Sequence, residues 1–99
     1  MNRKEYLLTC LAEECSELAI ECSKSKRFGL DSYGENDTVT LRYSNSENLV
    51  KEFVDVYALI KMLDQEGYIN YSFTDFQSKA KMDKVDKYYN ISKQLGLVE

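Results

Sequence analysis

The chain has 99 residues, a formal net charge of −4, no proline and no histidine. Its length is that of one domain, so we expect a single domain over residues 1–99 whose modest core favours oligomerisation. The absence of histidine excludes histidine-based triads, histidine-containing zinc sites and di-iron sites with histidine ligands, and the negative charge disfavours a nucleic-acid polymer as the main partner.

The first predicted element is a helix over about residues 3–25. Its apolar positions recur at helical spacing and are Leu7, Leu8, Leu11, Cys15, Leu18 and Cys22. An odd number of cysteines indicates reduced thiols in a cytosolic protein rather than a disulfide framework. We expect Cys15 and Cys22 to be buried as small hydrophobic residues.

A polar connection follows the first helix, over residues 28–46, and its alternating part at 38–43 permits a short extended piece. The second helix is expected from Ser46 or Glu47 to about Gln65, where Gly67 provides a stop. Its apolar residues cover more than one stripe, so we expect a central helix that is contacted on several sides.

The third helix is expected to begin after Ser72 or Thr74, with Thr74-Asp75 suited to capping, and to end before Gly96. The N-terminus lacks the apolar stretch of a secretory signal, and no apolar run approaches the roughly 18 residues of a membrane span. We therefore expect a cytoplasmic protein with no membrane partner.

Two acidic motifs contain the candidate functional residues of the sequence. The first helix contains Glu13-Glu14-Cys15-Ser16-Glu17 and the second contains Glu52-Phe53-Val54-Asp55. Residues three apart on a helix project to the same side, so Glu14 pairs with Glu17 and Glu52 pairs with Asp55.

The four carboxylates lie at the edge of an apolar face or within one. Bringing them together without a cation is unfavourable, and oxygen ligands suit magnesium or manganese. A single such motif is common on solvated helix faces. The pair of motifs, with the second on an apolar face, indicates a metal site.

These motifs resemble the MazG-like all-α nucleotide pyrophosphohydrolases, and in particular the small single-domain members found in bacteriophages. The resemblance covers most of the chain outside residues 30–45, through the stretches Leu11–Glu17, Lys24–Gly29, Asn48–Val56 and Lys81–Val85. It implies two long antiparallel helices with a third packing across them, assembled as a homodimer or homotetramer. It also implies magnesium-dependent hydrolysis of a nucleoside triphosphate to the monophosphate and pyrophosphate.

Carried over to this chain, the resemblance makes Glu14, Glu17, Glu52 and Asp55 metal ligands. It gives Glu13 the role of an outer-shell or second-metal carboxylate that helps to activate water. The nucleoside triphosphate is the substrate, and Mg²⁺ is the cofactor, with Mn²⁺ as a substitute.

The substrate-binding residues expected from the same resemblance are Lys24, Arg27, Asn48, Lys81, Lys84 and Tyr88. Each has an alternative explanation. Lys24 and Arg27 also suit the negative end of the helix dipole, Asn48 belongs to a first helical turn, and the lysines form a solvated basic face with Lys87. Tyr33, Tyr43 and Tyr71 are candidates for stacking on a base or for packing. The loop lacks the proline often found in relatives, so base preference is not carried over.

Two other functions remain open from the sequence. One is a catalytically inactive helical interaction or regulatory protein that keeps the fold, and the other is a simple cation-binding helical module. Intact acidic motifs favour the enzyme, because a tolerant binding module has no need for carboxylates on an apolar face.

Overall fold

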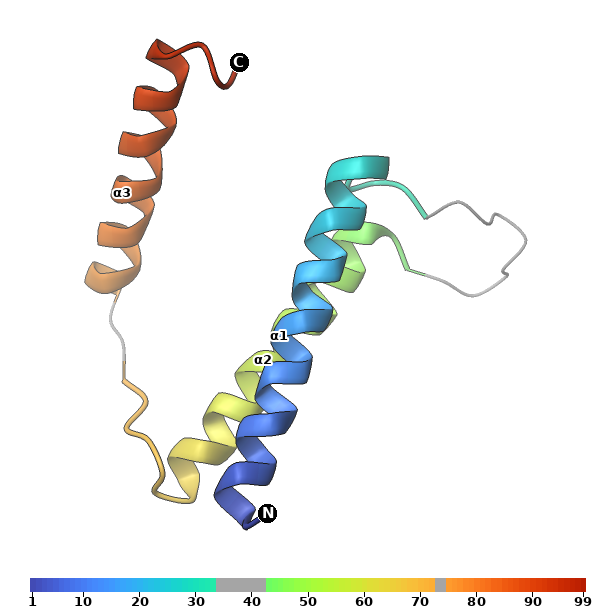
Figure 1. Cartoon of the computed structure of the whole chain (residues 1–99), viewed down its shortest axis with the longest axis vertical. Coiled ribbons are helices and arrows are strands. Elements are labelled where there is room, and N and C mark those ends of the chain that lie inside the picture. Colours follow the sequence, from blue (N-terminus) through green and yellow to red (C-terminus); the bar gives the residue numbers. More distant parts are fainter. Residues whose placement is uncertain (34–42, 73–74) are drawn as a thin grey trace.

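The structure is a computed structural model that describes residues 1–33, 43–72 and 75–99. It consists of three helices, α1 (Arg3–Phe28), α2 (Asn45–Gln65) and α3 (Asp75–Gln94), with no strand among the described residues (Figure 1). The all-α fold expected from the sequence is confirmed. The extended piece expected at 38–43 and the cap at Thr74 fall on or next to residues outside the described ranges, so their structure is not assessed.

Both helices of the N-terminal hairpin begin at a capping box. The side chain of Asn2 accepts a hydrogen bond from the amide of Glu5, and Ser44 accepts one from the amide of Glu47, while each glutamate side chain reaches back to the cap. These contacts satisfy amides that have no partner inside the helix. Helix α1 continues past the expected end at Ser25 and stops at Gly29, whose φ of 96° suits glycine.

Helices α1 and α2 pack side by side as an antiparallel pair. At the loop end, the amide of Asn45 donates to the carbonyl of Ser32 and its side chain donates to the carbonyl of Gly29, at 2.8 and 2.9 Å. At the other end, Arg3 forms two hydrogen bonds of 3.0 Å with the carboxylate of Glu66. The hairpin is therefore fastened at both ends.

The hydrophobic core of the described chain is small. Leu7 and Leu63, near the open end of the hairpin, are its buried apolar residues, each 1% exposed. The expectation that Cys15 and Cys22 are buried is wrong for this chain: both are exposed, because α2 is the helix that covers α1 and these cysteines lie outside that contact.

Helix α3 stands apart from the hairpin (Figure 1). Among the described residues it makes no helix–helix contact with α1 or α2. The expectation that a third helix packs across the first two is therefore not met within one chain, since the segment after α2 leads α3 away. None of the described helices has the length and apolarity needed to cross a membrane.

Candidate metal centre

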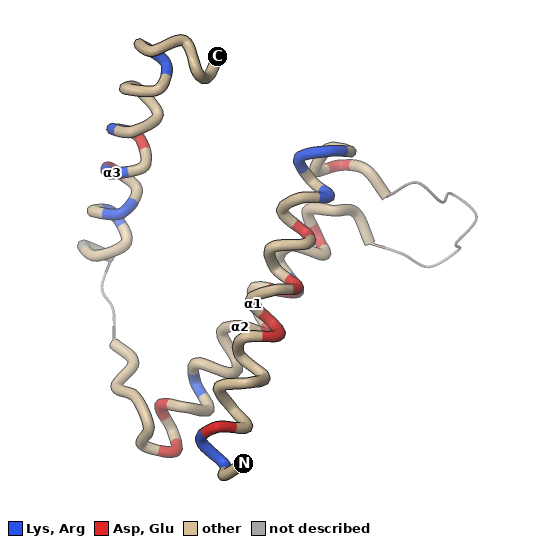
Figure 2. Tube along the Cα trace, in the orientation of Figure 1, with Lys and Arg blue, Asp and Glu red and all other residues tan. Residues whose placement is uncertain are grey.

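Three carboxylates from two helices converge on one point of the hairpin. Glu14 of α1 and Glu52 and Asp55 of α2 each offer an oxygen, and the three oxygens lie within 4.8 Å of one another. Glu52 and Asp55 share a side of α2 because they are three residues apart. Glu14 reaches them because the antiparallel pairing sets the middle of α1 beside the middle of α2. Figure 2 shows acidic positions along this part of the hairpin.

Within the cluster, the ionised form of Glu52 is disfavoured. Partial burial raises the pKa of Glu52 above its usual value, and the charges of Asp55 and Glu14 raise it further. A hydrogen bond with Glu14 and the charge of Glu17 act in the same direction. A divalent cation would relieve this repulsion, and three carboxylate oxygens are a donor set that suits magnesium. The residues present therefore fit the expected metal.

The structure separates the other two acids of the first motif from this cluster. Glu13 is exposed and does not belong to it. Glu17 is also exposed and lies outside the three-oxygen group, yet it is near enough to affect Glu52. Three of the four expected metal ligands are thus brought together, with the fourth beside them.

The expected substrate-binding residues of the hairpin lie towards its loop end. The ammonium of Lys24 is 3.4 Å from a carboxylate oxygen of Glu21, and the guanidinium of Arg27 lies 5.1 Å from the ring centre of Phe28. Asn48, one turn before Glu52, donates to the carbonyl of Tyr43 at 3.4 Å. Asn48 is one turn from Glu52, whereas Lys24 and Arg27 lie ten and thirteen residues beyond Glu14 along α1, about 15 and 20 Å by the rise of a helix.

The expected residues of α3 are not brought to the acidic cluster within one chain. Lys81, Lys84 and Tyr88 are exposed on α3, which makes no contact with the helices that carry the acids. Figure 2 shows the basic positions of α3 well separated from the acidic ones of the hairpin. Any contribution to the same site must come from another copy or after a movement of α3.

The candidate stacking tyrosines make contacts of other kinds. Tyr71 meets Tyr57 edge to face, with ring centres 5.9 Å apart, and the ring of Tyr43 lies 4.0 Å from the ammonium of Lys51. Tyr33 is exposed.

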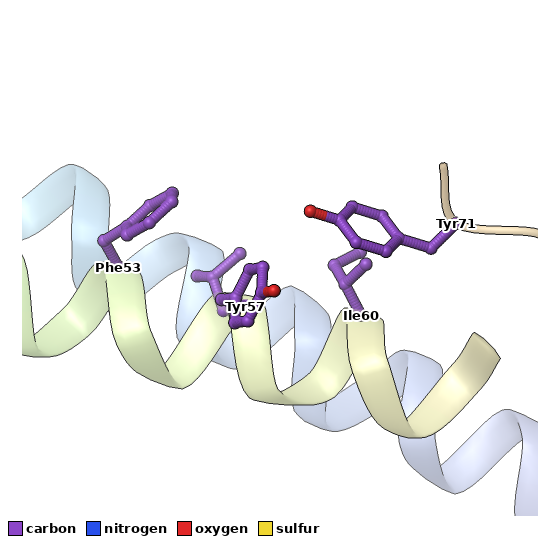
Figure 3. Close-up of a pocket in the computed structure, with 5 residues that line it drawn as sticks. Phe53, Tyr57, Ile60 and Tyr71 are labelled. Atoms are coloured by element: carbon purple, nitrogen blue, oxygen red, sulfur yellow. The ribbon is translucent and has the colours of Figure 1, made fainter. Parts of the chain in front are cut away.

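Sequence reasoning missed two features. The first is an apolar pocket of about 380 Å³ on α2, lined by Phe53, Val56, Tyr57, Ile60 and Tyr71 (Figure 3). The broad apolar face of α2 in the sequence is the feature that could have predicted this pocket. The second is the burial of Glu21, which is 7% exposed and has a carboxylate oxygen without a hydrogen-bond partner in the described part of the chain.

Comparisons with known proteins add no assignment to this geometry. The chain matches no family model, no curated protein and no solved structure at a significant level. The functional argument therefore depends on the cluster itself and on the motifs that form it.

Proposed function

We propose that the protein is a magnesium-dependent nucleoside triphosphate pyrophosphohydrolase, which hydrolyses its substrate to the monophosphate and pyrophosphate. The observation that carries the proposal is the convergence of Glu14, Glu52 and Asp55 within 4.8 Å across two helices. A solvated acidic face would keep such charges apart, whereas a hard cation draws them together. Magnesium fits this all-oxygen donor set, and manganese is its closest substitute.

The nucleotide substrate is supported by two arguments. Magnesium held by a few carboxylates keeps positions open for water and for phosphate oxygens, and the spacing of the two motifs resembles that of the MazG-like enzymes. When bound, the metal would neutralise phosphate charge and make water more acidic. In the proposal, Glu14, Glu52 and Asp55 hold the metal with Glu17 beside them, and an acid outside the cluster such as Glu13 takes up a proton.

Substrate contacts in this proposal come from residues near the loop end. Lys24 and Arg27 supply positive charge for phosphate groups, and Asn48 supplies a hydrogen-bonding amide one turn from Glu52. The substrates are deoxynucleoside or non-canonical nucleoside triphosphates in the cytoplasm, and the working form is a homodimer or homotetramer.

A second function is favoured by the exposed apolar faces of α2 and α3. Val50, Phe53 and Val54 of α2 are 58, 55 and 55% exposed, and patches of this kind mark protein contacts. A helical interaction or regulatory protein without catalysis would use the same faces, but it would have no need for the acidic cluster.

The test is a measurement of pyrophosphate and monophosphate release from a panel of ribo- and deoxynucleoside triphosphates. The parent, Glu52→Gln and Asp55→Asn are compared with magnesium and with a chelator. Asp83→Asn is the matched control, because this exposed acid of α3 pairs with Lys79 far from the cluster.

The proposal predicts release of both products by the parent and by Asp83→Asn, and a loss of at least about 100-fold in the two cluster variants. A folded parent that binds magnesium but hydrolyses none of the nucleotides would contradict the enzyme and favour the interaction protein.

A further inference from the structure

Helix α1 buries an acid whose hydrogen bonding is incomplete. Glu21 is 7% exposed, and its oxygen Oε2 has no hydrogen-bond partner among the described residues. The hydroxyl of Ser25, one turn further along α1 and on the same side, is also buried without a partner there. Because a buried acceptor without a partner is unfavourable, these two oxygens point to a ligand that supplies hydrogen bonds.

The nearest cation does not satisfy this carboxylate. The ammonium of Lys24 lies 3.4 Å from the other oxygen of Glu21, Oε1, and the side chain of Lys24 is 52% exposed. A long contact with a solvated ammonium contributes little, and it leaves Oε2 without a partner. A ligand that displaces this exposed side chain reaches the carboxylate, and the broad last torsion of a glutamate lets either oxygen turn towards the ligand.

The helix register places Glu21 on the interface between α1 and α2, at a distance from the acidic cluster. Glu14 meets Asp55 across this interface, and α2 is the described helix that packs on α1. Moving seven residues towards the loop end on both helices of the antiparallel pair brings Glu21 opposite Asn48. Seven residues of a helix span about 10.5 Å. A ligand held at the cluster by its phosphates therefore has Glu21 two helical turns away.

The two side chains define the chemical groups that such a ligand must present. An ionised carboxylate only accepts hydrogen bonds, whereas a serine hydroxyl donates or accepts. Like charge excludes a phosphate next to Glu21, so the site suits the nucleoside part of a nucleotide. Adenine, cytosine and guanine each carry an exocyclic amino group that donates, whereas uracil and thymine have an acceptor oxygen where cytosine has its amino group.

We propose that Glu21 and Ser25 form a nucleobase subsite that selects bases with an exocyclic amino group over uracil and thymine. Glu21 accepts a hydrogen bond from the amino group, and the hydroxyl of Ser25 bonds to the adjoining ring nitrogen. The subsite rests on the proposed function, which places the phosphates of the same nucleotide at the acidic cluster. A site built around such a hydrogen bond discriminates strongly against ligands that cannot form it, which gives the buried acid a role.

The test measures binding of non-hydrolysable analogues of CTP and UTP, with magnesium, by isothermal titration calorimetry. Because hydrogen bonds to charged groups are the stronger ones, we expect the parent to bind the CTP analogue about 10- to 100-fold more tightly. Glu21→Gln should reduce this ratio at least about 10-fold, since its amide donates as well as accepts. Glu21→Met should also reduce it, through weaker binding of the CTP analogue.

Two control variants separate the subsite from general effects on the fold. Asp83→Asn neutralises an exposed acid of α3, and Ser23→Ala removes an exposed hydroxyl of α1, so both should keep the ratio of the parent. Ser25→Ala should lower it by a smaller factor than Glu21→Gln, and circular dichroism verifies that every variant is helical. A parent that binds both analogues equally, or a Glu21→Gln variant that keeps the parent's ratio, would overturn the subsite.

The source of the hydrogen-bond donor is identified with ribose, 2′-deoxyribose and 2′,3′-dideoxyribose forms of the CTP analogue. A base subsite predicts that Glu21→Gln weakens the binding of all three by the same factor. A loss confined to the forms with sugar hydroxyl groups would show that Glu21 accepts from the sugar, and it would overturn the base subsite.

Product release by the same variants separates this subsite from the proposed function. Hydrolysis by the parent with an unchanged base preference in Glu21→Gln would retain the enzyme and overturn the subsite. Binding that prefers the CTP analogue and loses this preference in Glu21→Gln, without hydrolysis, would retain the subsite and overturn the enzyme. A folded parent that binds none of the analogues would overturn both.

Discussion

Glu14 and Glu52 bring carboxylate oxygens within 4.8 Å of each other although they lie on different helices. In the metal-free protein this contact opposes the packing of α1 on α2, because two like charges meet where burial already disfavours ionisation. The pKa of Glu52 is raised first by its partial burial and then by the charges of Asp55 and Glu14. An ionised Glu52 therefore lowers the stability of the metal-free fold, whereas a metal ligand at this position must be ionised.

Glu52→Gln is expected to raise the melting temperature of the metal-free protein by a few degrees and to abolish stabilisation by magnesium. The neutral amide removes the repulsion with Asp55 and Glu14, and it also removes a ligand. Thermal unfolding with a chelator and with magnesium, at neutral pH, measures both effects. Glu13→Gln is the control, since Glu13 is exposed outside the cluster and its metal-free melting temperature should equal that of the parent. A lower metal-free melting temperature in Glu52→Gln would contradict the account of the cluster.

A second buried acid, Glu21, is expected to limit the stability of the hairpin. It is 7% exposed, and one of its oxygens has no hydrogen-bond partner among the described residues, while the other is 3.4 Å from Lys24. Because an unsatisfied buried acceptor costs about 1–3 kcal/mol, Glu21→Met is expected to increase the free energy of unfolding by an amount in that range. Urea denaturation measures it, with Glu13→Met as the exposed control. A decrease would show that Glu21 has a stabilising partner in solution.

Much of the hairpin and of its acidic cluster was predictable from local sequence rules. Apolar periodicity located both helices, and the three-residue spacing of Glu52 and Asp55 fixed their common side. The sequence predicts an end of α1 near Ser25, which is too early, because the polar residues before Gly29 resemble a loop although the helix continues through them to Phe28.

The position of α3 and the exposure of the cysteines were not predictable in the same way. Periodicity shows that Val85 belongs to an apolar face, but it does not say whether the surface that covers this face lies in the same chain. Periodicity likewise predicts that Cys15 and Cys22 lie on an apolar face, but it does not say whether another helix covers them, and both are exposed. The burial of Glu21 was missed because it depends on how α2 is set against α1, which the sequence of α1 alone does not contain.

The N-cap residue of α2, Ser44, is expected to stabilise the helix that carries Glu52 and Asp55. Ser44 is 7% exposed, and it accepts a hydrogen bond from the amide of Glu47 at 3.2 Å. Ser44→Ala is expected to lower the free energy of unfolding by about 1 kcal/mol and the melting temperature by about 4–8 °C. Ser44→Thr keeps the acceptor and should recover most of the loss. An alanine variant as stable as the parent would indicate that this end of α2 does not need the cap.

The ion pair at the open end of the hairpin predicts a pH-dependent stability. Two hydrogen bonds from Arg3 hold the pKa of Glu66 below its usual value. A carboxyl group whose pKa is lower in the folded state stabilises the fold above its unfolded pKa, and this contribution is lost as the pH falls through the folded pKa. Glu66→Gln should therefore be less stable than the parent at neutral pH, and the difference should close between about pH 5 and pH 3.

Urea denaturation across that pH range measures the difference in free energy of unfolding between the parent and Glu66→Gln. Asp83→Asn is the matched control, because the pair of Asp83 with Lys79 is a more exposed contact within one helix, and such pairs contribute little. Arg3 keeps its charge throughout, so the change with pH belongs to Glu66. A difference between parent and Glu66→Gln that stayed constant down to pH 3 would show that Glu66 stabilises the hairpin by packing and not through its charge.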